Sequence, residues 1–214
     1  MPRPPSLPYV LPFAAFIALL AGLPALGLAP RAELALWVLV LGAVLLVFSR
    51  RVIDLSVGNI AGSAAVGVGV FALWIAPDLL FPGYRDALFG MDGPSFPAQA
   101  RTDPVALALR AARAVILVPI LEELFWRAWL PRWLIRHDFR SVPLGTYTPF
   151  TFVATALLFA VEHGQYWDVG LAAGVIYNAW MWRTKRLGDC IVAHAVTNAC
   201  LAVYVVTAGQ WQYW

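Results

Sequence analysis

Long apolar runs, separated by short polar gaps, make up most of the chain. A helix needs about 20 mostly apolar residues to cross a membrane, and seven runs are candidates. They lie at residues 8–28, 33–48, 57–81, 105–133, 147–163, 169–182 and 187–207. The pattern therefore predicts an all-α, polytopic transmembrane helix bundle with about seven spans, and we expect residues 1–214 to form a single integral membrane domain.

Composition supports a membrane rather than an aqueous environment. Hydrophobic residues make up 61% of the 214 residues and charged residues only 13%, and the mean hydropathy is +0.73. Soluble domains carry about 25% charged residues. Because so few polar side chains are available to face water, we expect membrane lipid to solvate much of the surface.

The basic residues between the apolar runs predict which connections face the cytoplasm. The formal net charge is +3, and most Arg and Lys residues lie in gaps between the apolar runs. If the N-terminus is cytoplasmic, the cytoplasmic side receives Arg3, Arg50, Arg51, Arg132, Arg136, Arg140, Arg183, Lys185 and Arg186, and the outer side receives Arg31, Arg85 and Arg101. Cytoplasmic loops are enriched in such residues. We therefore predict a cell (inner) membrane protein with a cytoplasmic N-terminus, a C-terminus outside and no nucleic-acid partner.

The first apolar run allows two interpretations. A cleaved signal peptide is one of them. Only Arg3 precedes the run as a charge, however, and Pro30 follows the small residues around Ala29. We therefore expect the run to remain in the protein as its first span.

Residues 82–102 form a long polar stretch that contains several Gly and Pro residues. One interpretation is an exposed loop. The other is a lid or a substrate-entry element, because functional residues often lie on loops.

The fourth run carries two adjacent acidic residues, Glu122 and Glu123. An ionisable residue in a membrane span costs about 2.5–3.5 kcal/mol on insertion scales, so such residues are functional candidates. Arg127 follows Glu123 by four residues, which favours an ion pair on a helix. Neighbouring residues on a helix point about 100° apart. We therefore expect Arg127 to hold Glu123 and Glu122 to remain free for acid–base chemistry.

Other residues of the fourth run leave alternatives open. Pro119 removes one helix hydrogen bond and is expected to leave the carbonyl of Val115 without a partner. This change either opens space for water or substrate, or is simply tolerated. Arg110 and Arg113 share a helix face, and they either extend to the outer membrane interface or capture a substrate carboxylate.

Two histidines and an asparagine lie in the fifth and seventh runs. His163 is compatible with holding a water, ligating a metal or occupying the membrane interface. His194 and Asn198 are four residues apart and share a helix face. They either donate hydrogen bonds to one oxyanion or connect helices. Together with Glu122, these side chains form the inventory of a hydrolase.

Depth within the membrane poses one difficulty for this interpretation. At a rise of about 1.5 Å per residue, Glu122 and Asn198 reach a similar depth, whereas His163 lies closer to the outer edge. Convergence therefore requires that the fifth helix is displaced inward or that its boundary lies elsewhere.

At these positions the sequence resembles the CAAX protease and bacteriocin-processing family of integral membrane proteins. The family pattern consists of three elements in a fixed order on separate helices. Here they read Glu122-Glu123-Leu124-Phe125-Trp126-Arg127, Phe159-Ala160-Val161-Glu162-His163 and His194-Ala195-Val196-Thr197-Asn198. The resemblance covers residues 121–198, and the chain is similar to bacterial members related to CAAX prenyl proteases.

The resemblance implies an intramembrane endopeptidase that hydrolyses a peptide bond in a membrane-associated protein or peptide substrate. A catalytic core would comprise residues 104–207, from the C-terminal four spans. Glu122 would be the general base, and His163 would help to hold the attacking water. His194 and Asn198 would stabilise the oxyanion.

The same resemblance leaves the chemistry open between a glutamate-dependent and a metal-dependent endopeptidase. Glu123 and Arg127 would support the site structurally. The sequence contains no His-Glu-x-x-His pair, a signature of zinc proteases, so no tightly bound metal is expected. If a divalent metal such as zinc is present, its ligands would be Glu122, His163 and His194.

Two other functions compete with a protease. A proton-coupled transporter also uses Glu and His inside the membrane, but the first three runs carry almost no ionisable residues for a continuous path. A non-catalytic immunity or scaffold protein is the other alternative. The sequence does not determine the substrate or the oligomeric state.

Overall fold

The computed structural model describes residues 4–90 and 96–214. Throughout these ranges the regular secondary structure is helical, without a β-strand. The prediction of an all-α helix bundle is therefore confirmed. Part of the polar stretch at 82–102 lies outside the described residues.

The helices follow the apolar runs closely. The α-helices are α1 (Leu7–Gly22), α2 (Pro30–Val44), α3 (Ile60–Leu80), α4 (Tyr84–Phe89), α5 (Pro104–Ala112), α6 (Val118–Glu123), α7 (Leu130–Ile135), α8 (Pro149–Glu162), α9 (Trp167–Thr184) and α10 (Leu187–Ala208). Turns of π-helix at Leu45–Ser49, Arg113–Leu117 and Leu124–Trp129 continue or join them, and short 3₁₀ turns occupy Leu23–Leu26, Ala98–Ala100, Phe139–Ser141, Gly164–Tyr166 and Trp211–Tyr213. Each of the seven predicted segments thus forms a helix.

Not all of these helices are suited to cross a membrane alone. Five helical stretches in the described ranges are long and apolar enough, namely Leu7–Leu26, Pro30–Ser49, Ile60–Leu80, Pro104–Ile135 and Leu187–Ala208. The fifth predicted run forms α8, whose 14 residues rise only about 21 Å. A bilayer core is about 30 Å thick. The sixth forms α9, which is longer but less apolar, and it packs against α8.

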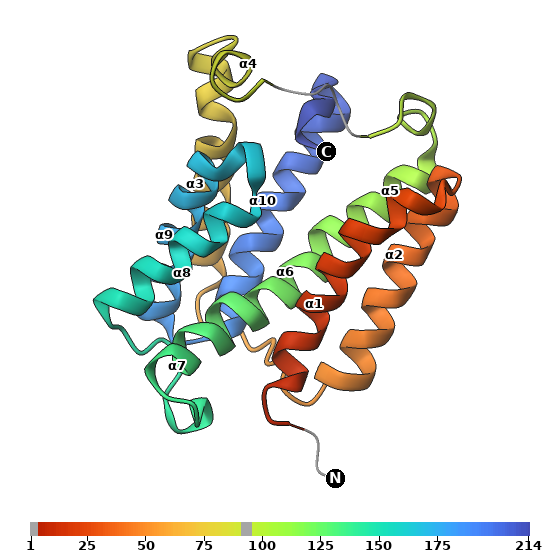
Figure 1. Cartoon of the computed structure of the whole chain (residues 1–214). Coiled ribbons are helices and arrows are strands. Elements are labelled where there is room, and N and C mark those ends of the chain that lie inside the picture. Colours follow the sequence, from red (N-terminus) through yellow and green to blue (C-terminus); the bar gives the residue numbers. More distant parts are fainter. Residues whose placement is uncertain (1–3, 91–95) are drawn as a thin grey trace.

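The helices form two groups around α10. Figure 1 shows α1, α2 and α5 on one side and α3, α8 and α9 on the other, with the long rod α5–α7 crossing from α5 to α7 below α8. α10 packs against α3, α6 and α9. The rod of 32 residues is about 48 Å long, so it exceeds the bilayer core and runs obliquely through the bundle (Figure 1).

The connections gather at two ends of the bundle. α1 begins and α10 ends at opposite ends (Figure 1). Close approaches of Gly58 to Arg186 and of Gly145 to Lys185 bring three connections together at one end. These connections carry most of the basic residues that were predicted to be cytoplasmic. The apolar helices identify a membrane protein, whereas the side that faces the cytoplasm stays a prediction.

A buried carboxylate fixes the start of α3 against α10. Asp189 is fully buried, and its Oδ1 accepts hydrogen bonds from the Asn59 N–H at 2.8 Å and the Ser63 hydroxyl at 3.0 Å. Its Oδ2 accepts from the Gly58 N–H at 3.1 Å. Because hydrogen-bonded partners surround it, the carboxylate tolerates burial and sets the register of the two helices.

A glycine then allows α3 and α10 to approach closely. A Cβ on Gly67 would lie 2.4 Å from the Ala193 carbonyl oxygen, so this position requires glycine. Across the same contact, the Thr197 hydroxyl donates to the Gly67 carbonyl at 2.8 Å. Small residues commonly permit such close packing in membrane helices. The contact sets the position of α10, which carries two of the predicted site residues.

The polar stretch is anchored by an arginine instead of lying loose. Arg85 of α4 is only 3% exposed. Its guanidinium donates to Asp78 and Asp168 at 3.0 Å each and to the Gln165 carbonyl at 2.9 Å. Most of the described residues of the stretch are exposed, and this buried arginine links α4 to the turn between α8 and α9.

Candidate active site

A cavity of about 280 Å³ opens into the centre of the bundle. Glu122 of α6, His163 at the end of α8, and His194 and Asn198 of α10 all line it. The structure therefore brings together the four predicted catalytic residues from three separate helices. Their roles in catalysis stay predictions.

Glu122 presents a carboxylate oxygen without a protein partner. The residue is 4% exposed, and its buried Oε2 forms no hydrogen bond. The Nε2 of His194 lies 4.0 Å from this oxygen, which exceeds hydrogen-bonding distance. Glu122 is thus free to accept a proton from a group in the cavity.

Each oxygen of Glu123 lies near a polar side chain, and Oε1 is the one that is hydrogen-bonded. Glu123 is fully buried, and its Oε2 lies 3.3 Å from Nε of Arg127. The predicted ion pair is therefore confirmed. Its Oε1 lies 2.9 Å from Nδ1 of His194, a contact that the sequence did not predict. Because an ionised carboxylate only accepts hydrogen bonds, we assign the hydrogen to Nδ1, so that Nε2 points toward Glu122.

His163 is held by the backbone of its own helix. Its Nδ1 lies 2.7 Å from the Phe159 carbonyl oxygen, and a carbonyl only accepts. The hydrogen is therefore assigned to Nδ1, and Nε2 keeps a lone pair. The difficulty of depth is resolved because α8 is short and ends at the cavity, where Gly164 adopts a φ of 54° and turns the chain.

The rod is wound as a π turn just before Pro119. In the π turn Arg113–Leu117, the Val118 N–H donates to the Arg113 carbonyl, five residues earlier. At this spacing, the carbonyl of Ala114 would need the N–H of residue 119. Proline has none.

Asn198 supplies the missing donor. Its Nδ2 donates to the Ala114 carbonyl at 2.8 Å. The sequence indicated the Val115 carbonyl, but in the π turn it is the Ala114 carbonyl that accepts the hydrogen bond from Asn198. An amide nitrogen carries two hydrogens, so Asn198 retains a second donor beside the cavity.

Tyr177 of α9 completes the wall, and sequence reasoning missed it. Its ring stacks on His194, with centroids 5.3 Å apart, and its hydroxyl lies 2.7 Å from that of Thr197. The guanidinium of Arg127 lies 4.6 Å from the ring centroid of Phe159 and 5.5 Å from that of Tyr177. An isolated aromatic residue in an apolar run carries no signal that distinguishes this role.

Glu162 was also left without a role. Its Oε2 accepts a hydrogen bond from the Trp126 indole at 2.8 Å. The contact ties the end of α8 to the turn after Glu123, and so it fixes the helix end that carries His163.

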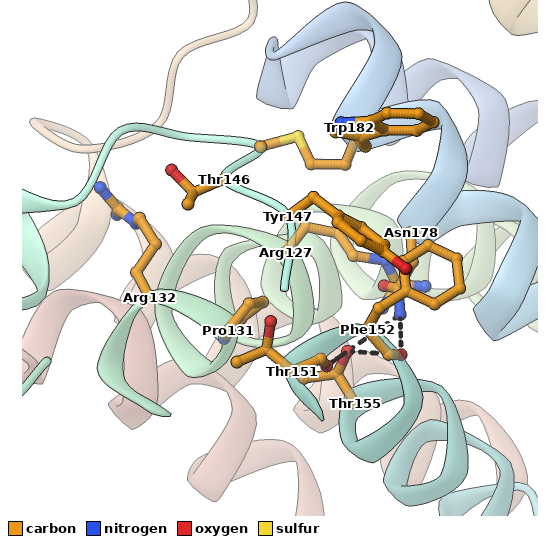
Figure 2. A pocket seen from close by; sticks show the side chains of 12 residues that line it. Arg127, Pro131, Arg132, Thr146, Tyr147, Thr151, Phe152, Thr155, Asn178 and Trp182 are labelled. Carbon is orange, nitrogen blue, oxygen red and sulfur yellow. Dashed lines mark hydrogen bonds between the residues drawn. The ribbon is translucent and has the colours of Figure 1, made fainter. Parts of the chain in front are cut away.

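Arg127 borders a separate, smaller pocket. Figure 2 shows Arg127 beside Asn178 and Tyr147, and the pocket volume is about 30 Å³. Asn178 donates to the Thr155 hydroxyl and to the Phe152 carbonyl at 2.9 Å each. Nη1 and Nη2 of Arg127 are buried without a protein partner. A pocket of this volume has room for one or two water molecules.

The cavity does not contain a preassembled metal site. Within residues 4–90 and 96–214, no three His, Cys, Asp or Glu side chains are gathered closely enough to hold a metal ion. This includes Glu122, His163 and His194. The expectations about a metal cofactor stay predictions.

Residues 104–200 match the model of a protein family described as type II CAAX prenyl endopeptidase Rce1-like. The match includes all three sequence elements that line the cavity. Over these residues, the chain is similar to the CAAX protease and bacteriocin-processing family. The family supports an intramembrane endopeptidase of the CAAX type. No match was found among curated proteins or among solved structures.

The rest of the cavity wall lies outside the part matched to the CAAX protease family. Phe16 and Leu20 of the first span and Trp74 of α3 line the cavity. The C-terminal residues Tyr213 and Trp214 line it as well. The acidic and imidazole groups that line the cavity thus come from the matched segment, and much of the apolar wall does not.

Proposed function

We propose that this protein is a glutamate-dependent intramembrane endopeptidase, in which Glu122 activates a water to hydrolyse a peptide bond of a membrane-associated protein. The main support for this proposal is that Oε2 of Glu122 forms no hydrogen bond and that Glu122 lines a cavity together with two histidines. We place the catalytic core in residues 104–207.

Glu122 and His163 would act on the water. The lone pair on Nε2 of His163 accepts one hydrogen of the water, and the Glu122 Oε2 takes the other as a proton. The water oxygen bonds to the peptide carbonyl carbon, and the electron pair of the C=O bond moves to the carbonyl oxygen. When the C–N bond breaks, Glu122 returns its proton to the leaving nitrogen.

His194 and Asn198 would stabilise the oxyanion. As an imidazolium paired with the Glu123 carboxylate, His194 would carry a hydrogen on each ring nitrogen. Its Nε2–H and the second N–H of Asn198 would then donate to the developing negative charge. Glu123 fixes the His194 ring through Nδ1, and the Ala114 carbonyl fixes the Asn198 amide. Donors held in this way need no rearrangement when the charge develops.

The proposed orientation in the membrane concerns which ends of the helices face the cytoplasm and how a substrate reaches the cavity. The basic connections gathered at one end favour a cytoplasmic N-terminus and an outer C-terminus in the cell membrane. A substrate anchored in lipid would then meet the cavity from within the bilayer.

The proposal is tested by cleavage in lipid nanodiscs. We use a farnesylated peptide with a CAAX-type end, because the matched family is described as prenyl endopeptidases. Glu122→Gln is expected to lower the rate by about 10²–10⁴-fold, whereas Asp138→Asn, an exposed control, leaves it unchanged. A metal chelator is expected to have no effect.

Undiminished cleavage by Glu122→Gln would contradict the proposed general base. Loss of activity on chelation, with recovery on adding zinc, would instead favour a metal-dependent endopeptidase.

A further inference from the structure

Two arginines line the same cavity as Glu122. Arg110 and Arg113 come from the start of the rod. Their Nε atoms are buried and have no hydrogen-bond partner. The guanidinium of Arg113 lies 4.4 Å from the ring centroid of Trp37, and that of Arg110 lies 5.5 Å from that of Trp214. The side chains therefore border internal space instead of extending along the lipid surface.

The positive charge of this pair is not neutralised by a close carboxylate. Within the described ranges, neither guanidinium forms an ion pair. Glu33 is the acidic residue that interacts electrostatically with Arg110. Glu33 lines a cavity together with both arginines but forms no ion pair with either. Because cations in a bundle interior are costly, two arginines beside one glutamate favour the binding of a further anion.

The arginines also border a second cavity. It has a volume of about 390 Å³ and shares Leu20, Arg110, Arg113 and Trp214 with the first. Its remaining lining is mostly apolar, with Pro24, Pro30, Leu34, Trp37, Phe96 and Pro97 beside Glu33. An anionic group held by the arginines would thus have apolar space next to it.

The distance along the rod suits a short peptide. Glu122 follows Arg113 by nine residues, which corresponds to about 14 Å of helix rise. An extended chain covers about 3.3–3.6 Å per residue, so about four residues bridge this interval.

We propose that Arg110 and Arg113 form a carboxylate-binding subsite that holds the peptide substrate about four residues from the scissile bond, with an adjoining apolar side chain in the second cavity. Arg binds carboxylates through paired, charge-assisted hydrogen bonds. The carboxylate is either a peptide C-terminus or the side chain of Asp or Glu. This inference rests on the proposed function, since it places a peptide in the cavity.

The test measures binding to the full chain in nanodiscs. Glu122→Gln serves as the background, so that cleavage does not consume the probe. The probes are dansylated apolar tetrapeptides with a free C-terminus, with an amidated C-terminus, or with an amidated C-terminal Glu. We expect at least one carboxylate probe to bind about tenfold to a hundredfold more tightly than the apolar amide. The probe that does so identifies the source of the carboxylate.

Variants then show which residues cause the tighter binding of the carboxylate probes. Arg113→Gln and Arg110→Gln are expected to reduce the affinity for the carboxylate probes strongly and to leave the affinity for the apolar amide unchanged. Arg113→Lys is expected to retain part of the carboxylate affinity because the positive charge remains. Arg51→Gln, at an exposed position, is the matched control.

Equal affinity for all three probes would overturn the inference, and this comparison does not depend on the folding of any arginine variant. A carboxylate preference that survives both Gln substitutions would also overturn it. Neither result bears on whether Glu122 is required for cleavage, so failure of the subsite and failure of the proposed catalytic base remain distinguishable.

Discussion

At the scale of residues, two adjacent glutamates differ in what they contact. Glu123 lies 3.3 Å from Arg127 and 2.9 Å from His194, whereas Oε2 of Glu122 forms no hydrogen bond and lies 4.0 Å from Nε2 of His194. The sequence predicted this division from the spacing of Glu123 and Arg127 alone. The contact with His194 was not predictable, because it depends on how α6 and α10 pack.

The two glutamates should therefore respond differently to neutralisation. Glu123→Gln removes one partner of a buried ion pair and leaves Arg127 uncompensated, which is expected to cost about 3–5 kcal/mol of stability. Glu122→Gln removes no ion pair with an arginine and is expected to leave the melting temperature in nanodiscs nearly unchanged. Equal melting temperatures for the two variants would contradict this assignment.

At the scale of elements, the π turn before Pro119 links the rod to α10. Hydrophobic periodicity predicts that the rod is helical but cannot distinguish a π turn from an α turn. For this reason the sequence indicated Val115, and the structure shows Ala114 as the carbonyl that Asn198 satisfies. π turns often occur at functional sites, and this one adjoins the cavity.

The link between Pro119 and Asn198 is tested by a double-mutant cycle. Asn198→Ala leaves a buried carbonyl unsatisfied and is expected to cost about 1–3 kcal/mol. In a Pro119→Ala background, the new N–H serves that carbonyl, so the same substitution should cost less. Thermal denaturation of the four proteins gives the coupling energy, and a coupling of zero would contradict the hydrogen-bond assignment.

Contact between α3 and α10 is tested by two glycines on α3. Gly67→Ala places a Cβ against the Ala193 backbone and is expected to destabilise the bundle by about 1–3 kcal/mol. Gly69 has open space around its Cα, so Gly69→Ala is expected to be neutral or mildly stabilising. The melting temperatures of the two variants provide the comparison, and similar values would argue against the close approach.

At the scale of the whole molecule, a charged and aromatic site is enclosed by an apolar bundle. The apolar runs predicted every helix that surrounds the cavity, since lipid exposure demands apolar side chains. α8 and α9 are not among the five helical stretches of the described residues that are long and apolar enough to cross a membrane, so their membrane-spanning role stays a prediction. The contribution of Tyr177 and the anchoring of Arg85 depend on tertiary contacts, which apolar periodicity does not encode.

The central claim is that a water activated by Glu122 attacks the peptide bond directly. A single turnover of the farnesylated peptide in H₂¹⁸O, analysed by mass spectrometry, tests this claim. We expect ¹⁸O in the new carboxylate of the product on the first turnover and none in Glu122. A first-turnover product without ¹⁸O, accompanied by label in the Glu122 carboxylate, would contradict the account, because it would show that Glu122 acts as a nucleophile.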